Sequence, residues 1–287
     1  SASEPIEEAV LTAAVDSVRI MGLQPVVFPS CSHIHGYLAG SDFARAEDLQ
    51  RAFADDSIDG ILCMQGGYGA QRIVDRLDWE SIADHPKFFG GHGDVTALHI
   101  QLNQKCHMAT WHIPMPATEW CKEVDIFTLA SLRRALFSGA PGPVYNPEEM
   151  VLRCVAKGTA RGQLTGGNLA AVVSTLGTPW EIDTRHKILF LEESETEPCR
   201  VDRMLLQLKQ AGKLTDCAGV LLGRFAPCEQ QSQTYISPED MFKELLLDEC
   251  KPVIAGIACG HGMPTLSLPL GLNILMDATS TTLTILE

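Results

Sequence analysis

Apolar residues recur every four positions near the start of the chain, at Ile6, Val10, Ala14 and Val18. This spacing predicts an amphipathic helix that places one face on a core. Ser3 is expected to cap the helix, with Pro5 in its first turn, and Gly22 is expected to end it. The chain therefore opens with a helix.

Short apolar runs then alternate with helical patterns. The expected strands span residues 24–28, 60–64, 88–90 and 108–112. The expected helices span residues 42–53, behind a Ser41 cap, and then 70–77, 95–103 and 126–137. Strict alternation predicts a parallel sheet with helices on both faces. Since domains of this kind usually open with a central strand, we expect a leading strand ahead of this numbering.

The pattern changes after a segment rich in proline and glycine at residues 140–147, which is the best candidate for a linker. The expected strands beyond it span residues 150–156, 160–164, 187–191, 218–222, 253–258 and 281–286, and the expected helices span 168–176, 201–211 and 238–248. We therefore predict two α/β domains. The N-terminal domain covers residues 1–140, and a C-terminal domain of mixed topology covers residues 150–287.

Composition narrows the class of protein. Of the 287 residues, 45% are hydrophobic and 20% are charged, which is typical of a globular protein. The formal net charge of −14 argues against nucleic acid or an anionic membrane as a partner. The ten cysteines are scattered and form no Cys-x-x-Cys pair, so we expect reduced thiols and a cytoplasmic protein. No apolar run approaches the ~18–20 residues of a membrane span.

Three glycine-rich turns follow apolar runs that are expected to be buried strands. They are Gly66-Gly67-Tyr68-Gly69, Gly90-Gly91-His92-Gly93-Asp94 and Gly260-His261-Gly262. Turns at the carboxyl ends of parallel strands present backbone N–H groups and catalytic side chains in α/β enzymes. The first turn has neither the glycine spacing of a dinucleotide site nor the lysine of a P-loop, so no nucleotide cofactor is expected. A plain tight turn and a cradle for an oxyanion explain it equally well.

Two side chains of the second half are candidates for proton transfer. His261 lies between two glycines that leave its ring accessible, and imidazole is suited to act as a base near neutral pH. Glu192 directly follows an apolar strand, where a carboxylate needs a partner, so it is a candidate to orient a histidine. A structural histidine and an exposed pair of Glu192 with Glu193 are the simpler alternatives.

The run from Cys31 to His35 alternates residue types that bind metals. No second cluster with matching spacing completes a site. A surface loop is therefore expected there, and no metal.

Six groups of motifs follow one another along the chain. They are Gly66-Gly67-Tyr68-Gly69-Ala70-Gln71-Arg72 with Leu77-Asp78-Trp79, Gly91-His92-Gly93-Asp94-Val95-Thr96-Ala97, Gly166-Gly167-Asn168-Leu169, Gly177-Thr178-Pro179-Trp180, Leu189-Phe190-Leu191-Glu192-Glu193 with Arg200-Val201-Asp202-Arg203-Met204-Leu205, and Gly260-His261-Gly262 with Leu268-Pro269-Leu270-Gly271. Together they resemble the LD-carboxypeptidase family of serine peptidases, which includes the muramoyltetrapeptide carboxypeptidases and the microcin C immunity proteins. The set covers nearly the whole chain and resembles the murein-recycling branch more than the immunity branch.

The resemblance implies an N-terminal flavodoxin-like α/β/α domain, a C-terminal swivelling mixed α/β domain and a homodimer. It implies a Ser–His–Glu triad in which His261 is the base and Glu192 the orienting carboxylate. The implied oxyanion hole uses the backbone N–H groups of Gly67 and Asp94.

The resemblance also implies a substrate. The family removes the terminal D-Ala from murein tetrapeptides, by cleaving its bond to the L-centre of diaminopimelate, without a metal or cofactor. The partner expected here is therefore a murein tetrapeptide or a related small peptide. The expected substrate contacts are Gly66, Thr96 and Asn168.

Three departures from the family pattern bear on activity. The nucleophilic serine falls on Gly93, the family's Gly-Pro-Met reads Ile113-Pro114-Met115, and the leading strand with its Pro-Ser turn is absent or reduced to Ser1-Ala2-Ser3. Because glycine has no hydroxyl to attack a carbonyl, the chain as written is expected to be inactive. A peptide-binding pseudoenzyme is one alternative. A hydrolase of the immunity type is another, and it would need aromatic residues near the site to stack a nucleotide base.

Overall fold

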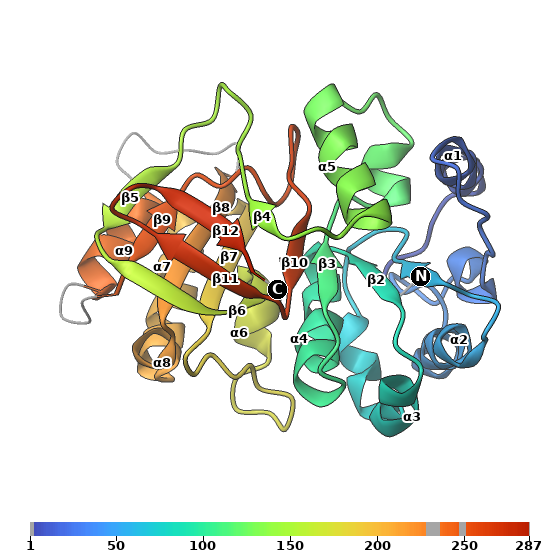
Figure 1. The fold of residues 1–287 in the computed structure, drawn as a ribbon. Helices are drawn as coiled ribbons and strands as arrows, with labels where there is room; N and C mark the ends of the chain where they lie inside the picture. Colours follow the sequence, from blue (N-terminus) through green and yellow to red (C-terminus); the bar gives the residue numbers. More distant parts are fainter. Residues whose placement is uncertain (1–2, 228–235, 247–250, 287) are drawn as a thin grey trace. The chain divides into compact units, whose positions relative to one another are not determined.

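The computed structural model describes residues 3–227, 236–246 and 251–286, and the chain forms two compact units. The N-terminal unit comprises the residues up to Ser138 together with Ser267–Pro269, and the C-terminal unit comprises Gly139–Leu266 together with the residues from Leu270 onward. Each unit is built around one sheet, whose strands can be followed in Figure 1. The short return of residues 267–269 to the N-terminal unit was not predicted from the sequence.

The sheet of the N-terminal unit has four described strands, in the order β1 (Gly60–Leu62), β2 (Phe88–Gly91), β3 (Thr110–His112) and β10 (Leu268–Leu270). β1 pairs in parallel with β2, and β2 pairs in parallel with β3. The predicted parallel sheet is therefore confirmed over these three strands. Parallel strands place their carboxyl ends at one edge of a sheet, and so the turns that follow β1 and β2 emerge on the same side.

Helices connect these strands. The α-helices are α1 (Glu8–Ile20), α2 (Asp42–Ala54), α3 (Trp79–Asp84), α4 (Thr96–Lys105) and α5 (Ile126–Phe137), and shorter helical turns span Pro29–Ser32, Ala70–Arg76, Gly93–Val95 and Pro116–Trp120. Ser41 caps α2 as predicted, since its Oγ accepts a hydrogen bond from the N–H of Ala44 at 3.2 Å. The helix predicted over residues 126–137 is confirmed as α5.

The helices form layers on both faces of this sheet, as the alternation predicts. Neighbouring residues of a strand point to opposite faces. Phe88 packs against an apolar cluster to which α1 contributes Val18 and α5 contributes Leu132 and Ala135. The ring of Phe89 stacks on Phe53 of α2, with 6.2 Å between ring centroids, and meets the ring of His99 of α4 edge-on. The core of the unit therefore holds β2 between two helical layers.

The predicted start of the first helix is wrong. α1 begins at Glu8, and Glu7, which precedes it, makes no side-chain cap hydrogen bond. Ser3 is fully buried instead, and its hydroxyl donates to Oδ2 of Asp94 at 2.6 Å. A tertiary bond to a carboxylate thus replaces the local cap, because charged acceptors bind a hydroxyl more strongly than neutral ones. Gly22 does follow the helix end, with a φ of +90°.

One further prediction for the N-terminal unit is wrong. Residues 24–28 belong to no strand, and among the described residues no strand lies beside them to pair with. A strand without a hydrogen-bonding neighbour is not stable by itself. The helix predicted over residues 70–77 is confirmed, and Ala70–Arg76 is of the 3-10 type and follows Gly69. α3 and β10 were not predicted.

The sheet of the C-terminal unit has eight described strands. Their order is β4 (Gly142–Pro143), β12 (Thr282–Ile285), β11 (Asn273–Asp277), β6 (Thr159–Asn168), β7 (Ile188–Thr196), β8 (Gly219–Pro227), β9 (Val253–Ala255) and β5 (Arg153–Ala156). Neighbouring strands from β6 to β9 are parallel, and the outer pairs are antiparallel. The predicted mixed topology is confirmed, although β4 and β11 were not predicted.

The helices of the C-terminal unit are α6 (Leu169–Ser174), α7 (Pro198–Gln210), α8 (Lys213–Asp216) and α9 (Pro238–Leu246). All except the short α8 were predicted. β7 lies between β6 and β8, and its first four residues, Ile188 to Leu191, are completely buried. β7 therefore holds Glu192, the residue after Leu191, in the interior of the unit.

Two chemical features concern the described residues alone. The eight cysteines among them are free thiols. No helix within the described ranges combines the length and apolar character that crossing a membrane requires.

Candidate active site

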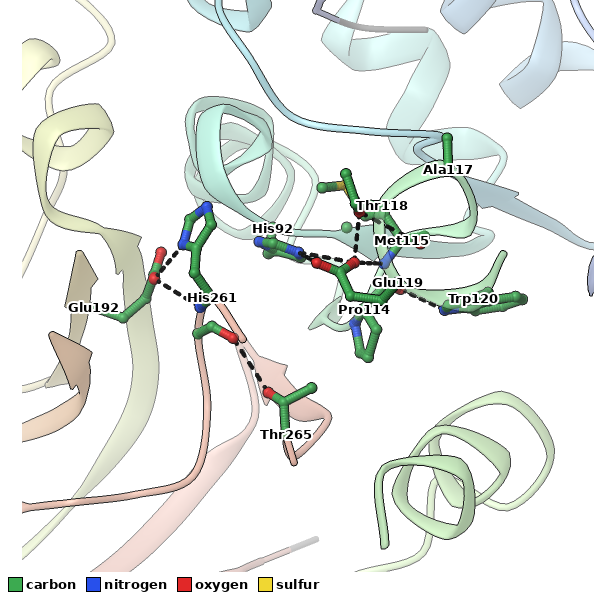
Figure 2. A network of polar contacts seen from close by, with 12 residues as sticks. His92, Pro114, Met115, Ala117, Thr118, Glu119, Trp120, Glu192, His261 and Thr265 are labelled. Atoms are coloured by element: carbon green, nitrogen blue, oxygen red, sulfur yellow. Dashed lines mark hydrogen bonds and ion pairs between the residues drawn. The ribbon is translucent and has the colours of Figure 1, made fainter. Parts of the chain in front are cut away.

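A carboxylate and an imidazole form a hydrogen-bonded pair in the C-terminal unit (Figure 2). Oε2 of Glu192 lies 2.7 Å from Nδ1 of His261, and the backbone N–H of His261 donates to the same oxygen at 3.3 Å. The side chain of Glu192 is completely buried, whereas that of His261 is 36% exposed. A buried carboxylate at Nδ1 fixes the ring orientation and leaves Nε2 for proton transfer. The pairing predicted for these two residues is present.

The pair is possible because β7 and the loop after β9 approach closely. Gly260 has a φ of +116°, and a Cβ at this position would lie 2.8 Å from Oε2 of Glu192. A side chain at residue 260 would therefore displace the carboxylate. Thr265 reinforces the loop, since its hydroxyl donates to the carbonyl oxygen of Gly260 at 3.3 Å.

Arg224 anchors the loop that carries His261. Its Nη1 donates to the carbonyl oxygen of His261 at 3.2 Å, and its Nη2 donates to that of Pro264 at 2.9 Å. Burial lowers the pKa of the Arg224 guanidinium. Arg224 was not predicted from the sequence. A charged residue shortly after a buried apolar run was the signal that identified Glu192, and Arg224 shows it as well, after the buried run of β8.

The strand–turn–helix around residue 93 lies in the N-terminal unit. β2 ends at Gly91, and a 3-10 turn at Gly93–Val95 leads into α4. Gly93 has a φ of +66°. A positive φ at a sharp turn between a strand and a helix is the geometry in which α/β hydrolases expose a nucleophile. Position 93 therefore has the backbone of a nucleophile elbow without the nucleophile.

The turn after β1 lies against this elbow. A Cβ on Gly66 would lie 3.8 Å from the carbonyl oxygen of His92 and 3.9 Å from the backbone nitrogen of Asp94. Oδ2 of Asp94 accepts a hydrogen bond from the N–H of Ala70 at 2.7 Å, in addition to that from Ser3. The side chain of Asp94 thus ties the two turns together. The hydrogen bonds lower the pKa of Asp94, but burial outweighs them and raises it above its ordinary value.

A second network supports the elbow from β3 and the turn after it (Figure 2). Nε2 of His92 lies 3.2 Å and 3.3 Å from the two carboxylate oxygens of Glu119. Glu119 also accepts hydrogen bonds from the N–H of Met115 at 2.7 Å and the hydroxyl of Thr118 at 2.5 Å. Burial alone raises the pKa of Glu119, but His92 and these donors outweigh it and lower the pKa to about 2. Nothing in the sequence pattern pointed to Glu119.

The predicted site residues fall into two groups. Gly66, Gly67, Gly93 and Asp94 lie at the two adjoining turns of the N-terminal unit, whereas Glu192 and His261 lie in the C-terminal unit. The assembly of both groups into one site stays a prediction.

Two of the predicted substrate contacts have structural roles. Thr96 is completely buried at the start of α4. Asn168 caps α6, with its Oδ1 accepting from the N–H of Ala171 at 3.1 Å, and its Nδ2 donates to Oε1 of Glu193 at 3.1 Å. Their contact with a substrate stays a prediction. Among the described residues, no group of three or more histidine, cysteine or acidic side chains is arranged to hold a metal ion.

Comparison with protein families identifies both halves of the chain. Residues 1–113 match the LD-carboxypeptidase N-terminal domain, and residues 161–276 match the LD-carboxypeptidase C-terminal domain. A probable murein peptide carboxypeptidase of Bacillus subtilis (strain 168) is 37% identical over 98% of this chain and 88% of the relative. The chain belongs to the LD-carboxypeptidase family. The family resemblance read from the motifs is confirmed.

More distant relatives and solved structures extend the comparison. The microcin C7 self-immunity protein MccF of Escherichia coli is 23% identical over 88% of this chain and 80% of the relative. The structure of MccF in complex with glutamyl sulfamoyl guanosine superposes with a TM-score of 0.91 at 21% identity, covering 100% of this chain and 94% of the other. Muramoyltetrapeptide carboxypeptidase from Oxalobacter formigenes gives 0.85 at 24% identity, covering 99% and 96%. These superpositions confirm the two-domain α/β fold.

Proposed function

We propose that this chain is the scaffold of a serine-type LD-carboxypeptidase that removes the terminal D-Ala from murein tetrapeptides in peptidoglycan recycling. The observation that carries the proposal is the Glu192–His261 pair, a buried carboxylate that orients a partly exposed imidazole. Family membership, and the identity to a probable murein peptide carboxypeptidase, support the substrate class. The elbow conformation of Gly93 supports the position of the missing nucleophile.

In the proposed mechanism, His261 and Glu192 act on a serine at position 93. The serine oxygen attacks the carbonyl carbon of the scissile peptide while His261 takes the hydroxyl proton. The N–H groups of Gly67 and Asp94 stabilise the resulting oxyanion. When the carbon–nitrogen bond breaks, the imidazolium returns the proton to the amine of D-Ala. Water then hydrolyses the acyl ester with His261 again as base, which regenerates the serine.

With Gly93, the chain as written forms no acyl-enzyme. In a serine hydrolase, loss of the nucleophile lowers turnover by roughly 10⁶-fold. The imidazole and the backbone donors remain, so binding of peptide is retained. Without a nucleophile, the chain as written binds peptide and does not cleave it, as the pseudoenzyme alternative states. The hydrolase proposal concerns the same site with a serine at position 93.

Restoring the hydroxyl tests the proposal. The Gly93→Ser variant is incubated with a murein tetrapeptide, and released D-Ala is measured beside the chain as written and Gly93→Ala. Release by Gly93→Ser alone supports the proposal. Absence of D-Ala release by all three proteins contradicts it, provided that circular dichroism shows Gly93→Ser to be folded. Calorimetry with the tetrapeptide separates binding from turnover.

One observation favours a second substrate class, the acyl-sulfamoyl nucleotides. Tyr68, in the turn that carries Gly67, is 56% exposed, and its ring meets that of Tyr37 edge-on with 5.7 Å between centroids. Exposed aromatic rings beside a site can stack a nucleotide base. The MccF structures include complexes with sulfamoyl nucleosides. Hydrolysis of such a compound by Gly93→Ser, lost with Tyr68→Ala, would favour this immunity-type activity over murein peptide cleavage.

We further propose that the protein acts in the cytoplasm as a homodimer. The free state of the eight described cysteines supports a reducing compartment. The family resemblance supports the dimer. Sedimentation equilibrium at micromolar concentration tests the oligomeric state, and a monomer throughout would contradict the proposal.

A further inference from the structure

An arginine that the proposed mechanism does not use lies buried beside the turn that carries Gly67. The side chain of Arg45, in α2, is completely buried. Its Nη1 donates to the carbonyl oxygen of Gly69 at 2.8 Å, and its Nη2 donates to Oδ1 of Asp42 at 2.5 Å. Because removing a guanidinium from water is costly, a buried arginine is expected only where its hydrogen bonds hold something in place.

The contact with Gly69 places Arg45 at one end of a single peptide group. The carbonyl oxygen of Gly69 and the N–H of Ala70 belong to the same planar unit. Nη1 of Arg45 binds the oxygen, and Oδ2 of Asp94 accepts from the N–H at 2.7 Å. The peptide group is therefore held between a guanidinium and a carboxyl group. We refer to Arg45, this peptide group and the side chain of Asp94 as the turn clamp.

Residue 69 must be a glycine for the guanidinium to reach the turn. Gly69 has a φ of +125°, and a Cβ at this position would lie 2.9 Å from Nη1 of Arg45. The same Cβ would lie 2.6 Å from Cδ2 of Leu38. A side chain at residue 69 would therefore displace the guanidinium, in addition to the strain that the positive φ imposes.

The two ends of the turn clamp reinforce each other. A peptide group whose oxygen binds a cation becomes a stronger N–H donor, and one whose N–H binds a carboxylate becomes a stronger acceptor. Burial raises the pKa of Asp94, and the positive charge of Arg45 acts in the opposite direction. Arg45 therefore favours the ionised form of Asp94, which accepts the N–H most strongly. Loss of Arg45 is expected to weaken the bond at the other end as well.

Asp42 fixes the guanidinium of Arg45 from the side away from the turn. Both oxygens of Asp42 also accept from Arg72, from Nε at 2.9 Å and from Nη2 at 2.8 Å. The hydrogen bonds from Arg72 and Arg45 outweigh burial and lower the pKa of Asp42 to about 2, so this carboxylate is ionised at neutral pH. Arg72 belongs to the 3-10 helix that directly follows the turn. Asp42 thus joins α2 to the turn through two arginines.

The turn clamp acts on both candidate oxyanion donors. Asp94 supplies one donor, its backbone N–H, and its side chain belongs to the clamp. Gly67 supplies the other and lies two residues before Gly69 in the same turn. The two turns are in contact, since a Cβ on Gly66 would lie 3.9 Å from the backbone nitrogen of Asp94. The spacing of the two donors therefore depends on the clamp that joins their turns.

We propose that Arg45 is a positioning residue that sets the spacing of the two oxyanion donors by holding the Gly69–Ala70 peptide group against Asp94. Its effect on catalysis rests on the proposed function, whereas its effect on the turn does not. Arg45 is too deeply buried to touch a substrate. An arginine that only stabilised the fold would change the folded fraction of the protein and leave kcat of the folded molecules unaltered.

Amide hydrogen exchange on the chain as written tests the turn clamp without reference to activity. Arg45→Met removes the cation and keeps most of the bulk of the side chain. It is expected to speed exchange at Ala70 by roughly 10-fold or more relative to the amides of β2, because the peptide group loses a charged partner. Arg51→Met is the matched control, since Arg51 is an exposed arginine of the same helix. The control should leave the exchange at Ala70 unchanged.

Kinetics in the Gly93→Ser background test the effect on catalysis. Arg45→Met is expected to lower kcat for D-Ala release by roughly 10–100-fold with KM nearly unchanged, because displaced donors stabilise the transition state less well. Arg45→Lys should give an intermediate kcat. An ammonium restores the charge, but it does not reproduce the planar fork that binds Gly69 and Asp42 together. Arg51→Met should retain full activity.

The outcomes separate a positioning role from a structural one. Parental exchange at Ala70 and parental kcat in folded Arg45→Met would overturn the proposal, as would exchange that accelerates equally at Ala70 and in β2. If circular dichroism shows that Arg45→Met does not fold, Arg45→Lys decides, and parental values of both quantities in that variant would overturn the proposal. Faster exchange at Ala70, with no D-Ala release in the Gly93→Ser background, would support the turn clamp and contradict the proposed function.

Discussion

Nδ1 of His261 lies 2.7 Å from Oε2 of Glu192, and the two residues are 69 positions apart in the sequence. The carboxylate comes from the middle of β7, where its side chain is completely buried, and the imidazole comes from a glycine-flanked loop. The buried partner cannot turn toward water, so it holds the ring in one orientation. This relationship is the basis of the predictions on catalysis.

Removing the charge of Glu192 should disable the base. In the Gly93→Ser background, Glu192→Gln is expected to lower kcat by roughly 10³–10⁴-fold with little change in KM, because the amide favours the wrong tautomer of the imidazole. Steady-state kinetics with the tetrapeptide measure both constants. Glu239→Gln, which removes a surface partner of Arg153, is the matched control and should retain activity. Retained activity in Glu192→Gln would exclude its orienting role.

Arg224 should act as a positioning residue for His261. Arg224→Gln in the Gly93→Ser background is expected to lower kcat by roughly 10–100-fold, because two loop carbonyls lose their donor. Proton NMR provides the specific readout, since the Nδ1–H resonance of His261 should weaken as the loop loosens. Arg224→Lys should recover part of kcat and part of the intensity of the Nδ1–H resonance. An unchanged resonance with reduced activity would show that Arg224 acts elsewhere.

Any side chain with a Cβ at position 93 should cost stability. Gly93 has a φ of +66°, a region that residues other than glycine adopt at a cost of about 1–2 kcal/mol. Gly93→Ser and Gly93→Ala are both expected to lower the free energy of unfolding by this amount in urea titrations. Only the serine should gain activity. If neither variant lost stability, the elbow would have a different backbone in solution.

The Glu119–His92 pair predicts a pH dependence of stability. Since the pKa of Glu119 is lowered to about 2, ionised Glu119 contributes stability that is fully present above about pH 5 and is lost as the pH falls toward 2. Glu119→Gln should remove this part of the dependence. Unfolding free energies measured between pH 2 and 7 test it, with the exposed Glu123→Gln as the control. An unchanged profile in Glu119→Gln would contradict the assignment.

Patterns that are local in sequence predicted much of this fold. The alternation of apolar runs and helices gave the parallel sheet of the N-terminal unit, and the Ser41 cap depends only on the three residues that follow it. The glycine turns showed where the strands end. Glu192, directly after the predicted strand at residues 187–191, was a candidate to orient a histidine because a carboxylate there requires a partner. The family resemblance then paired it with His261.

Contacts between distant segments were the features that the sequence did not predict. Ser3 bonds to Asp94 rather than to its own helix, because a tertiary partner outweighs the local one. β10 is three residues long and carries no periodic signal. The Glu119–His92 pair joins residues 27 positions apart, and Glu119 lies in the short helical turn Pro116–Trp120, which was not predicted. Residues 24–28 have the apolar pattern of a strand and were predicted as one. They form none, because a strand also needs a hydrogen-bonding neighbour.

The proposed function requires that His261 and position 93, which belong to different units, come together in one site. The most direct test places a thiol at residue 93 and follows its alkylation by iodoacetamide against pH, resolved from the other cysteines by peptide mass spectrometry. If the two meet, the Gly93→Cys thiol should ionise well below its ordinary pKa of about 8.5, and His261→Ala should return it toward that value. Identical alkylation profiles with and without the imidazole would contradict the claim.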